Sequence, residues 1–311
     1  MLVNLNKVLP AARKNKYAVG AFNFSNLELA QAIVQAADAL GAPVVIQTSE
    51  GAIEYGGMEY LAAIGHVAAQ IHEKIPVVLH LDHGRDPALV EKAIKSGWYT
   101  SVMIDVSNLA YAENVRITSR IVEMAHERGM SVESELGPIL GVEDKLRSTE
   151  AAFTDPKQVK QFIADTKCDA LAISVGTAHG LIKYPRGVTP KIDIARLEEI
   201  AAISSIPLVL HGASCVPHVL LERIHEKCET LNDCSRAHDA VGVPEDQIQR
   251  AIAAGISKIN VDSDIRLAFT GAVRQELMTD TDITDPRKLI GPGRDAVQQM
   301  VSDRIKLFGW K

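Results

Sequence analysis

The stretch Ile75-Pro76-Val77-Val78-Leu79-His80-Leu81-Asp82-His83-Gly84 joins an apolar run to a cluster of polar residues. Its first five residues predict a buried β-strand, and a helical pattern follows the glycine. Polar side chains buried without partners cost about 1–3 kcal/mol each. Their position at the end of a strand therefore calls for a partner, and a metal ion or a substrate would supply one.

The same pattern of a β-rich apolar run followed by a helical run repeats along the chain. The expected strands are Val19–Phe24, Val44–Thr48, Val77–Leu81, Ser101–Val106, Ser131–Leu136, Ala170–Val175, Pro207–His211 and Lys258–Val261. The expected helices, with apolar residues at three-to-four spacing, are Leu27–Leu40, Glu59–Glu73, Pro87–Ser96, Ala112–Arg128, Asp155–Thr166, Asp193–Ile203, Pro244–Ala254 and Ile265–Met278.

Eight strand–helix repeats predict an α/β fold with a parallel sheet, and eight is the number that closes a (β/α)8 TIM barrel. The alternative is an open doubly wound sheet, but its G-x-G-x-x-G fingerprint is missing at Gly20-Ala21-Phe22-Asn23. An extra C-terminal helix is expected at Asp295–Leu307, and long loops at Leu136–Asp155 and Ala213–Gly242. We expect residues 1–311 to form a single domain.

The composition is that of a globular protein, with 47% hydrophobic and 23% charged residues and a net charge of −6. This charge argues against nonspecific binding to nucleic acid or to an anionic membrane. No stretch reaches the ~20 apolar residues of a membrane span. The N-terminus lacks the apolar core of a signal peptide, and four cysteines without such a signal indicate reduced thiols in a cytoplasmic protein.

Each predicted strand ends in polar residues, and in a barrel these ends meet at one face. Three of the ends carry histidines, His83, His179 and His211. Three protein ligands with an open fourth position are typical of catalytic zinc. Asp105 and Glu135 would either ligate a second metal position or hydrogen-bond the histidines.

Asp82 precedes one of these histidines and is a candidate general base, with orientation of a histidine as the alternative. Lys258 would point into the barrel together with Asn260. A desolvated lysine can form a Schiff base with a carbonyl substrate. The interpretation we favour is an ion pair between Lys258 and an inward carboxylate such as Glu133.

The turns after the last three strands offer a phosphate site built from backbone N–H groups. Its candidate residues are Gly180, Lys183, Gly212, Ser214, Asp262 and Ser263. A second set of metal-type ligands, His225, Cys228, Cys234 and His238, lies in the long loop after the seventh strand. Its spacing matches no common zinc motif, so we interpret it as a loop with free thiols.

At these residues the sequence resembles the class II, metal-dependent ketose-bisphosphate aldolases. The matching stretches are Gly20–Asn23, Ser49–Gly51, His80–Gly84, Ser101–Asp105, Glu133–Gly137, Gly176–Gly180, His211–Ser214 and Lys258–Ser263. They follow the family's order over nearly the whole chain.

The resemblance implies zinc on His83, His179 and His211, with Asp82 as the acid/base at the C4 hydroxyl. Asp105 and Glu135 would hold an alternative or second divalent metal position. The remaining implied roles are proton transfer at C1 by Glu143, stabilisation of the reacting intermediate by Asn260, substrate contacts by Asn23 and Ser49, and phosphate binding by the six candidates above, with a monovalent cation (Na⁺ or K⁺) nearby.

The resemblance further implies an aldehyde-lyase that reversibly cleaves fructose 1,6-bisphosphate and forms homodimers or homotetramers. Tagatose 1,6-bisphosphate, the C4 epimer, is the alternative substrate. A Schiff-base aldolase and a non-catalytic barrel that senses sugar phosphates are the remaining alternatives.

Overall fold

The computed structural model describes residues 1–143, 146–148, 153–180, 190–216, 220–221 and 241–311. Eight parallel strands form a closed barrel in the order β1-β11-β10-β8-β5-β4-β3-β2. They are β1 (Val19–Asn23), β2 (Val44–Thr48), β3 (Val77–Gly84), β4 (Ser101–Ile104), β5 (Ser131–Leu136), β8 (Ala170–Ile173), β10 (Leu208–Leu210) and β11 (Ile256–Val261). The first and last strands pair, with Val19 opposite Lys258. The predicted TIM barrel is confirmed, and the open sheet is excluded.

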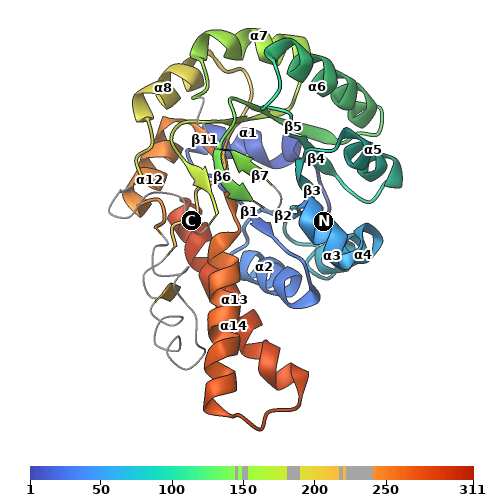
Figure 1. Ribbon diagram of the computed structural model, residues 1–311, viewed down its shortest axis with the longest axis vertical. Coiled ribbons are helices and arrows are strands. Elements are labelled where there is room, and N and C mark those ends of the chain that lie inside the picture. The colour runs from blue at the N-terminus through green and yellow to red at the C-terminus, as the bar shows by residue number, and fades with distance from the viewer. Residues whose placement is uncertain (144–145, 149–152, 181–189, 217–219, 222–240) are drawn as a thin grey trace.

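Helices surround the barrel (Figure 1). The helices that follow the barrel strands are α2 (Leu27–Ala39), α4 (Met58–Ile71), α5 (Pro87–Ser96), α6 (Tyr111–His126), α7 (Pro156–Thr166), α8 (Ile194–Ile203), α12 (Glu245–Ala254) and α13 (Ser263–Thr279). Their ends follow local chemistry. In α5, for example, Asp86 accepts a hydrogen bond from the N–H of Ala88, and Gly97 ends the helix in the left-handed conformation.

Helix α1 (Leu5–Asn15) was not predicted from the sequence. It closes the amino-terminal end of the barrel. Its buried side chains Leu5, Val8, Leu9 and Ala12 form one cluster with inward residues of the strands, including Val78. The barrel interior is therefore a packed core at this end, and the opposite end, where the strands finish, remains for a site.

The loop expected at 136–155 contains a hairpin of β6 (Leu140–Glu143) and β7 (Leu146–Ser148). The two-residue strand β9 (Ala178–His179) pairs in parallel with β6. A further short helix, α3 (Glu50–Gly56), follows β2. Elements this short lack enough periodic positions to be recognised in a sequence.

The C-terminal helix α14 (Pro286–Leu307) begins nine residues earlier than the predicted start at Asp295. Asp285 caps it by accepting from the N–H of Arg287, and Pro286 stands in its first turn. The stretch Gly291-Pro292-Gly293 interrupts the helical pattern without ending the helix. Helices α13 and α14 project together from the barrel (Figure 1). Among the described residues, no helix is long and apolar enough to cross a membrane.

Candidate active site

Three buried histidines converge at the carboxyl ends of β3, β9 and β10. They are His83, His179 and His211, and each offers a ligand nitrogen within 4.8 Å of the others. The Nε2 atom of His83 lies 2.7 Å from Nδ1 of His211. The rings of His83 and His179 are packed edge to face with centroids 4.8 Å apart. The three imidazoles predicted at separate strand ends therefore form one cluster.

The position of His83 depends on a break in the alternation of β3. His83 has a φ of 44°, in the left-handed region, where a non-glycine residue is strained by about 1–2 kcal/mol. The next residue, Gly84, packs closely against β4, since a Cβ on Gly84 would lie 2.6 Å from the carbonyl oxygen of Met103. This kink lets Asp82 and His83, which would face opposite sides of an ideal strand, both lie at the site.

Two carboxylates orient the histidine rings from behind. Nδ1 of His83 is 2.8 Å from Asp105 Oδ2, and Nε2 of His211 is 2.6 Å from Glu133 Oε1. Each ring thus directs its other nitrogen at the cluster, as in metal sites where a carboxylate fixes the tautomer of a ligand histidine. Burial and the neighbouring His83 lower the pKa of His211 to about 4, so its imidazole is neutral at pH 7.

These features fit a bound zinc ion. Buried imidazoles with converging nitrogens are a donor set that zinc prefers, and they leave a position open for a further ligand. Nε2 of His83 and Nδ1 of His211 lie 2.7 Å apart. Two lone pairs at this distance repel each other unless one nitrogen carries a proton or both nitrogens bind the same cation. The three histidines would therefore be the residues that hold the ion.

A second group with metal-type ligands shares His83. Asp105, Glu135 and His83 offer ligand atoms within 4.8 Å of one another. The hydroxyl of Ser107 lies 2.9 Å from Asp105 Oδ1 and 2.8 Å from Glu135 Oε1. Burial and the charge of Asp105 raise the pKa of Glu135 to about 8. The structure thus brings Asp105 and Glu135 together beside His83. This arrangement is compatible with a second metal position and with hydrogen bonds that orient His83.

Asp82 is held by two amides on neighbouring strands. Nδ2 of Asn23 donates to Asp82 Oδ2 at 3.0 Å, and Nδ2 of Asn260 donates to Oδ1 at 2.9 Å. Behind them, Gln47 donates to Asn23 Oδ1 at 2.7 Å and Lys258 donates to Asn260 Oδ1 at 2.6 Å. The carboxylate is therefore fixed beside the histidine cluster. The sequence analysis did not single out Gln47, although its place at the end of β2 was the available signal.

Lys258 is fully buried and forms an ion pair with Glu133, with Nζ and Oε2 2.9 Å apart. This is the structural ion pair that we favoured from the sequence. An amine that forms a Schiff base must be neutral and accessible to the carbonyl. The buried ion pair therefore argues against the Schiff-base alternative. Glu133 also orients His211, a second role that the sequence analysis missed.

The described candidates for the phosphate site lie at the same end of the barrel. A Cβ on Gly212, whose φ is +62°, would lie 2.6 Å from the carbonyl oxygen of Ala178, so the turn after β10 lies against β9. Ser214 is buried in that loop, and Ser263 starts α13, whose N-terminal N–H groups favour an anion. Gly180 follows β9 with a φ of 91°. Lys183 lies outside the described residues.

A cavity of about 330 Å³ lies at the ends of β1, β2 and β11, and its lining includes Asn23, the hydrogen-bond donor to Asp82. Three residues predicted to contact substrate line it, Asn23, Ser49 and Asp262. Tyr55 and Arg266, which the sequence analysis did not name, line it as well. The guanidinium of Arg266 is paired with Asp262 at 2.8 Å. The cavity is therefore a substrate-sized space with a basic group at its wall.

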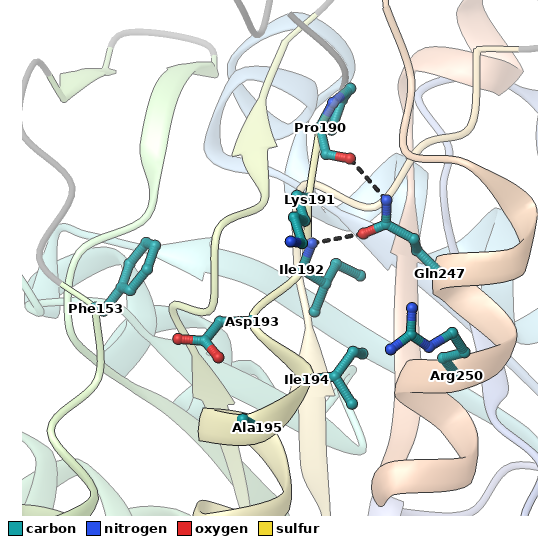
Figure 2. Close-up of a pocket in the computed structure, with 9 residues that line it drawn as sticks. All are labelled: Phe153, Pro190, Lys191, Ile192, Asp193, Ile194, Ala195, Gln247 and Arg250. Carbon is teal, nitrogen blue, oxygen red and sulfur yellow. Dashed lines mark hydrogen bonds between the residues drawn. The ribbon is translucent and has the colours of Figure 1, made fainter.

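A cavity of about 590 Å³ lies between the start of α8 and α12, where the side chain of Gln247 hydrogen-bonds the backbone of Pro190 and Ile192 (Figure 2). Glu143 ends β6, and its side chain is not described. The His/Cys set in the loop after β10 (His225, Cys228, Cys234 and His238) also lies outside the described residues.

Comparisons with known proteins agree with this arrangement. The profile of the family "Fructose-bisphosphate aldolase class-II" matches residues 3–311. Proteins named fructose-bisphosphate aldolase from Thermus caldophilus and Giardia intestinalis are 44% and 43% identical; the alignments cover 99% of this chain and 98% and 93% of those proteins. The solved YdjI aldolase of Escherichia coli matches with a TM-score of 0.78 at 27% identity, over 100% of this chain and 98% of that chain. The chain belongs to the class-II fructose-bisphosphate aldolase family.

Proposed function

We propose that this protein reversibly cleaves fructose 1,6-bisphosphate to dihydroxyacetone phosphate and glyceraldehyde 3-phosphate, with zinc as the metal. The observation that carries the proposal is the convergence of His83, His179 and His211 beside Asp82 at the mouth of a closed barrel. Membership of the family supplies the reaction class, an aldehyde-lyase.

His83, His179 and His211 would hold the ion, and Asp105 and Glu135 would offer a second divalent position. When bound, the ion supplies Lewis acidity that stabilises the negative charge developing as the C3–C4 bond breaks. Asp105 and Glu133 contribute by keeping the imidazoles oriented, so that the site needs little reorganisation during the reaction.

Asp82 would accept the proton of the C4 hydroxyl during cleavage and return it to the aldehyde oxygen during condensation. Its two carboxylate oxygens accept hydrogen bonds from Asn23 and Asn260, which fix the orientation of the carboxylate. Asn260 would also offer its amide to charge that develops on the substrate. Glu143 is proposed to move the C1 proton.

The substrate would span the mouth of the barrel. We propose that one phosphate binds the turns with backbone N–H groups, at Gly180, Lys183, Gly212, Ser214, Asp262 and Ser263, with Na⁺ or K⁺ nearby. The rest of the sugar would reach the cavity lined by Asn23 and Ser49. The phosphate site takes no part in the bond cleavage itself. By anchoring the substrate at a distance from the scissile bond, it positions the reacting atoms beside the catalytic groups.

Tagatose 1,6-bisphosphate, the C4 epimer, is the alternative substrate, and the names of the relatives favour the fructose epimer. Comparing kcat/KM for the two bisphosphates decides between them. We expect the value for fructose 1,6-bisphosphate to be higher by at least tenfold, which corresponds to about 1.4 kcal/mol in the transition state. A higher value for tagatose 1,6-bisphosphate would reverse the assignment.

We also propose that residues 1–311 form one domain, that the protein acts in the cytoplasm, and that it forms a homodimer or homotetramer. The pairing of β1 with β11 supports the first, because strands from the N-terminal and C-terminal parts of the chain complete one barrel. Size-exclusion chromatography with light scattering would give the number of subunits.

The test of the function is an aldol-cleavage assay before and after complete chelation. We expect the apoprotein to lose activity and to regain it with about one equivalent of zinc per subunit, because the three histidines form one site. Activity that survives chelation would contradict the proposed function. Substrate binding without turnover in the zinc-loaded protein would support the sensor alternative.

A further inference from the structure

Lys258 is a buried charge with no part in the chemistry proposed above. Its side chain is 0% exposed, although burying an ammonium group costs several kcal/mol. Its Nζ atom contacts two acceptors, Glu133 Oε2 at 2.9 Å and Asn260 Oδ1 at 2.6 Å. A buried ion pair is on average no more stable than a well-packed apolar replacement. Stability alone therefore does not account for a lysine here.

The first contact leads to the metal site. Glu133 uses its other oxygen, Oε1, to accept a hydrogen bond from Nε2 of His211 at 2.6 Å. That bond places the proton of the imidazole on Nε2 and leaves Nδ1 as an acceptor, which lies 2.7 Å from Nε2 of His83 and 3.1 Å from Nδ2 of Asn260. The lysine thus neutralises the carboxylate that sets the tautomer and the ring orientation of His211.

The second contact leads to the proton-transfer group. By donating to Oδ1 of Asn260, the lysine turns the NH₂ end of that amide toward Asp82, 2.9 Å away. The other amide on Asp82, Asn23, is oriented in the same way by a neutral donor, Gln47. Both amides therefore accept a hydrogen bond from a further donor. Of these two donors, Lys258 also contacts Glu133, the partner of His211.

We propose that Lys258 is a positioning residue that couples the two halves of the active site. Through Glu133 it holds His211 for the metal, and through Asn260 it holds Asp82 for the proton, so both halves share one anchor on β11. The inference rests on the proposed aldolase function for its catalytic half, whereas its metal-binding half stands on the geometry of Lys258, Glu133 and His211.

The test compares two variants that remove the anchor with two controls. Lys258→Met leaves the carboxylate of Glu133 buried without its cation and is expected to fold poorly. The double variant Glu133→Gln/Lys258→Met removes both charges together and restores a neutral, folded interior. Gln47→Leu removes the donor behind Asn23 alone. Arg304→Met removes a different buried cation, whose ion pairs are with Asp264 and Glu245.

Four quantities are measured for each variant: the unfolding midpoint of the apoprotein, the zinc Kd by competition with a chelator, and kcat and KM for cleavage. We expect the double variant to raise the zinc Kd by about 10–100-fold, a typical effect of losing the partner of a ligand histidine, and also to lower kcat at saturating zinc. Gln47→Leu should lower kcat and leave the zinc Kd unchanged. Arg304→Met should lower the midpoint and leave zinc Kd and kcat unchanged.

The proposal is overturned if the double variant has the zinc Kd and kcat of the wild type and differs only in the unfolding midpoint, since the Lys258–Glu133 pair would then be purely structural. A change in kcat without a change in zinc Kd would overturn the coupling. If the zinc-loaded wild type does not cleave the bisphosphate, the proposed function fails, and the zinc Kd of the variants still decides whether the Lys258–Glu133 pair positions His211.

Discussion

At the scale of single residues, Asp82 is the group on which the proposed proton transfer depends. Replacing it with asparagine keeps the size of the side chain but removes the base. We expect Asp82→Asn to lower kcat for cleavage by about 10²–10⁴-fold, the range that general acid–base catalysis contributes. The control in the same samples is the zinc content, which should stay at the wild-type level because the three histidines are unchanged. A kcat near that of the wild type would remove Asp82 from the mechanism.

His80 carries a prediction about pH. It is fully buried, with Nδ1 2.9 Å from the hydroxyl of Ser101. Burial, together with the charge of Lys258, lowers the pKa of His80 to about 3 from 6.5. Its approach to within 3.7 Å of Glu133 is therefore not an ion pair at neutral pH, because the imidazole is uncharged.

This shift makes stability depend on pH with a defined sign. Between pH 6.5 and about 3 the unfolded chain binds a proton at His80 that the folded protein does not. The contribution is therefore complete above pH 6.5 and decreases as the pH falls, by about 1.4 kcal/mol per pH unit for one group. Urea unfolding of the apoprotein from pH 7 to pH 5 should show a shallower dependence for His80→Gln than for the wild type. Parallel dependences would show that His80 is not neutral in the fold.

At the scale of elements, the turn after β10 shows how two loops are held together. Gly212→Ala should destabilise the protein by more than the roughly 1–2 kcal/mol of a left-handed alanine, because the new Cβ would meet the backbone of Ala178 at 2.6 Å. It should also raise KM, because the turn is part of the proposed phosphate site. Urea unfolding and steady-state kinetics measure the two effects.

Gly97→Ala is the matched control, since Gly97 has a φ of +71° and a Cβ added there would meet nothing within 4 Å. It should lose only the conformational cost and keep the wild-type KM. Equal losses of stability in the two variants, with KM unchanged in both, would mean that the contact with Ala178 is of no consequence.

The barrel strands and their helices could be predicted from the sequence because each carries a strong, repeated hydrophobic pattern. The backbone conformation at the end of β3 could not be predicted, because nothing in the sequence indicates that a histidine at position 83 adopts the left-handed conformation. The pairing of Glu133 with His211 was missed for a related reason: it joins β5 to β10, and the register between distant strands is a property of the closed barrel. The polar residues at the strand ends were predictable, whereas their partners were not.

At the scale of the whole molecule, the candidate metal ligands come from β3, β9 and β10, which lie far apart in the chain. A metal bound there stabilises the folded barrel, because the unfolded chain does not hold the histidines together. We expect zinc at about 100 times its Kd to add about 2.7 kcal/mol to the free energy of unfolding. Thermal unfolding at increasing zinc concentrations measures this. His179→Ala should weaken the effect, and Mg²⁺, which prefers oxygen ligands, should not replace zinc.

Helix α1 seals one end of the barrel with Leu5, Val8, Leu9 and Ala12. Within the part of the chain that the structure describes, the histidine cluster therefore faces solvent through the opposite mouth, and the ion and the sugar would share this entrance. A sugar bisphosphate bound across this mouth would cover the route by which the ion leaves. The protein should therefore lose zinc to a chelator more slowly when it is saturated with the sugar bisphosphate than when it is free, so that substrate protects the enzyme from losing its metal.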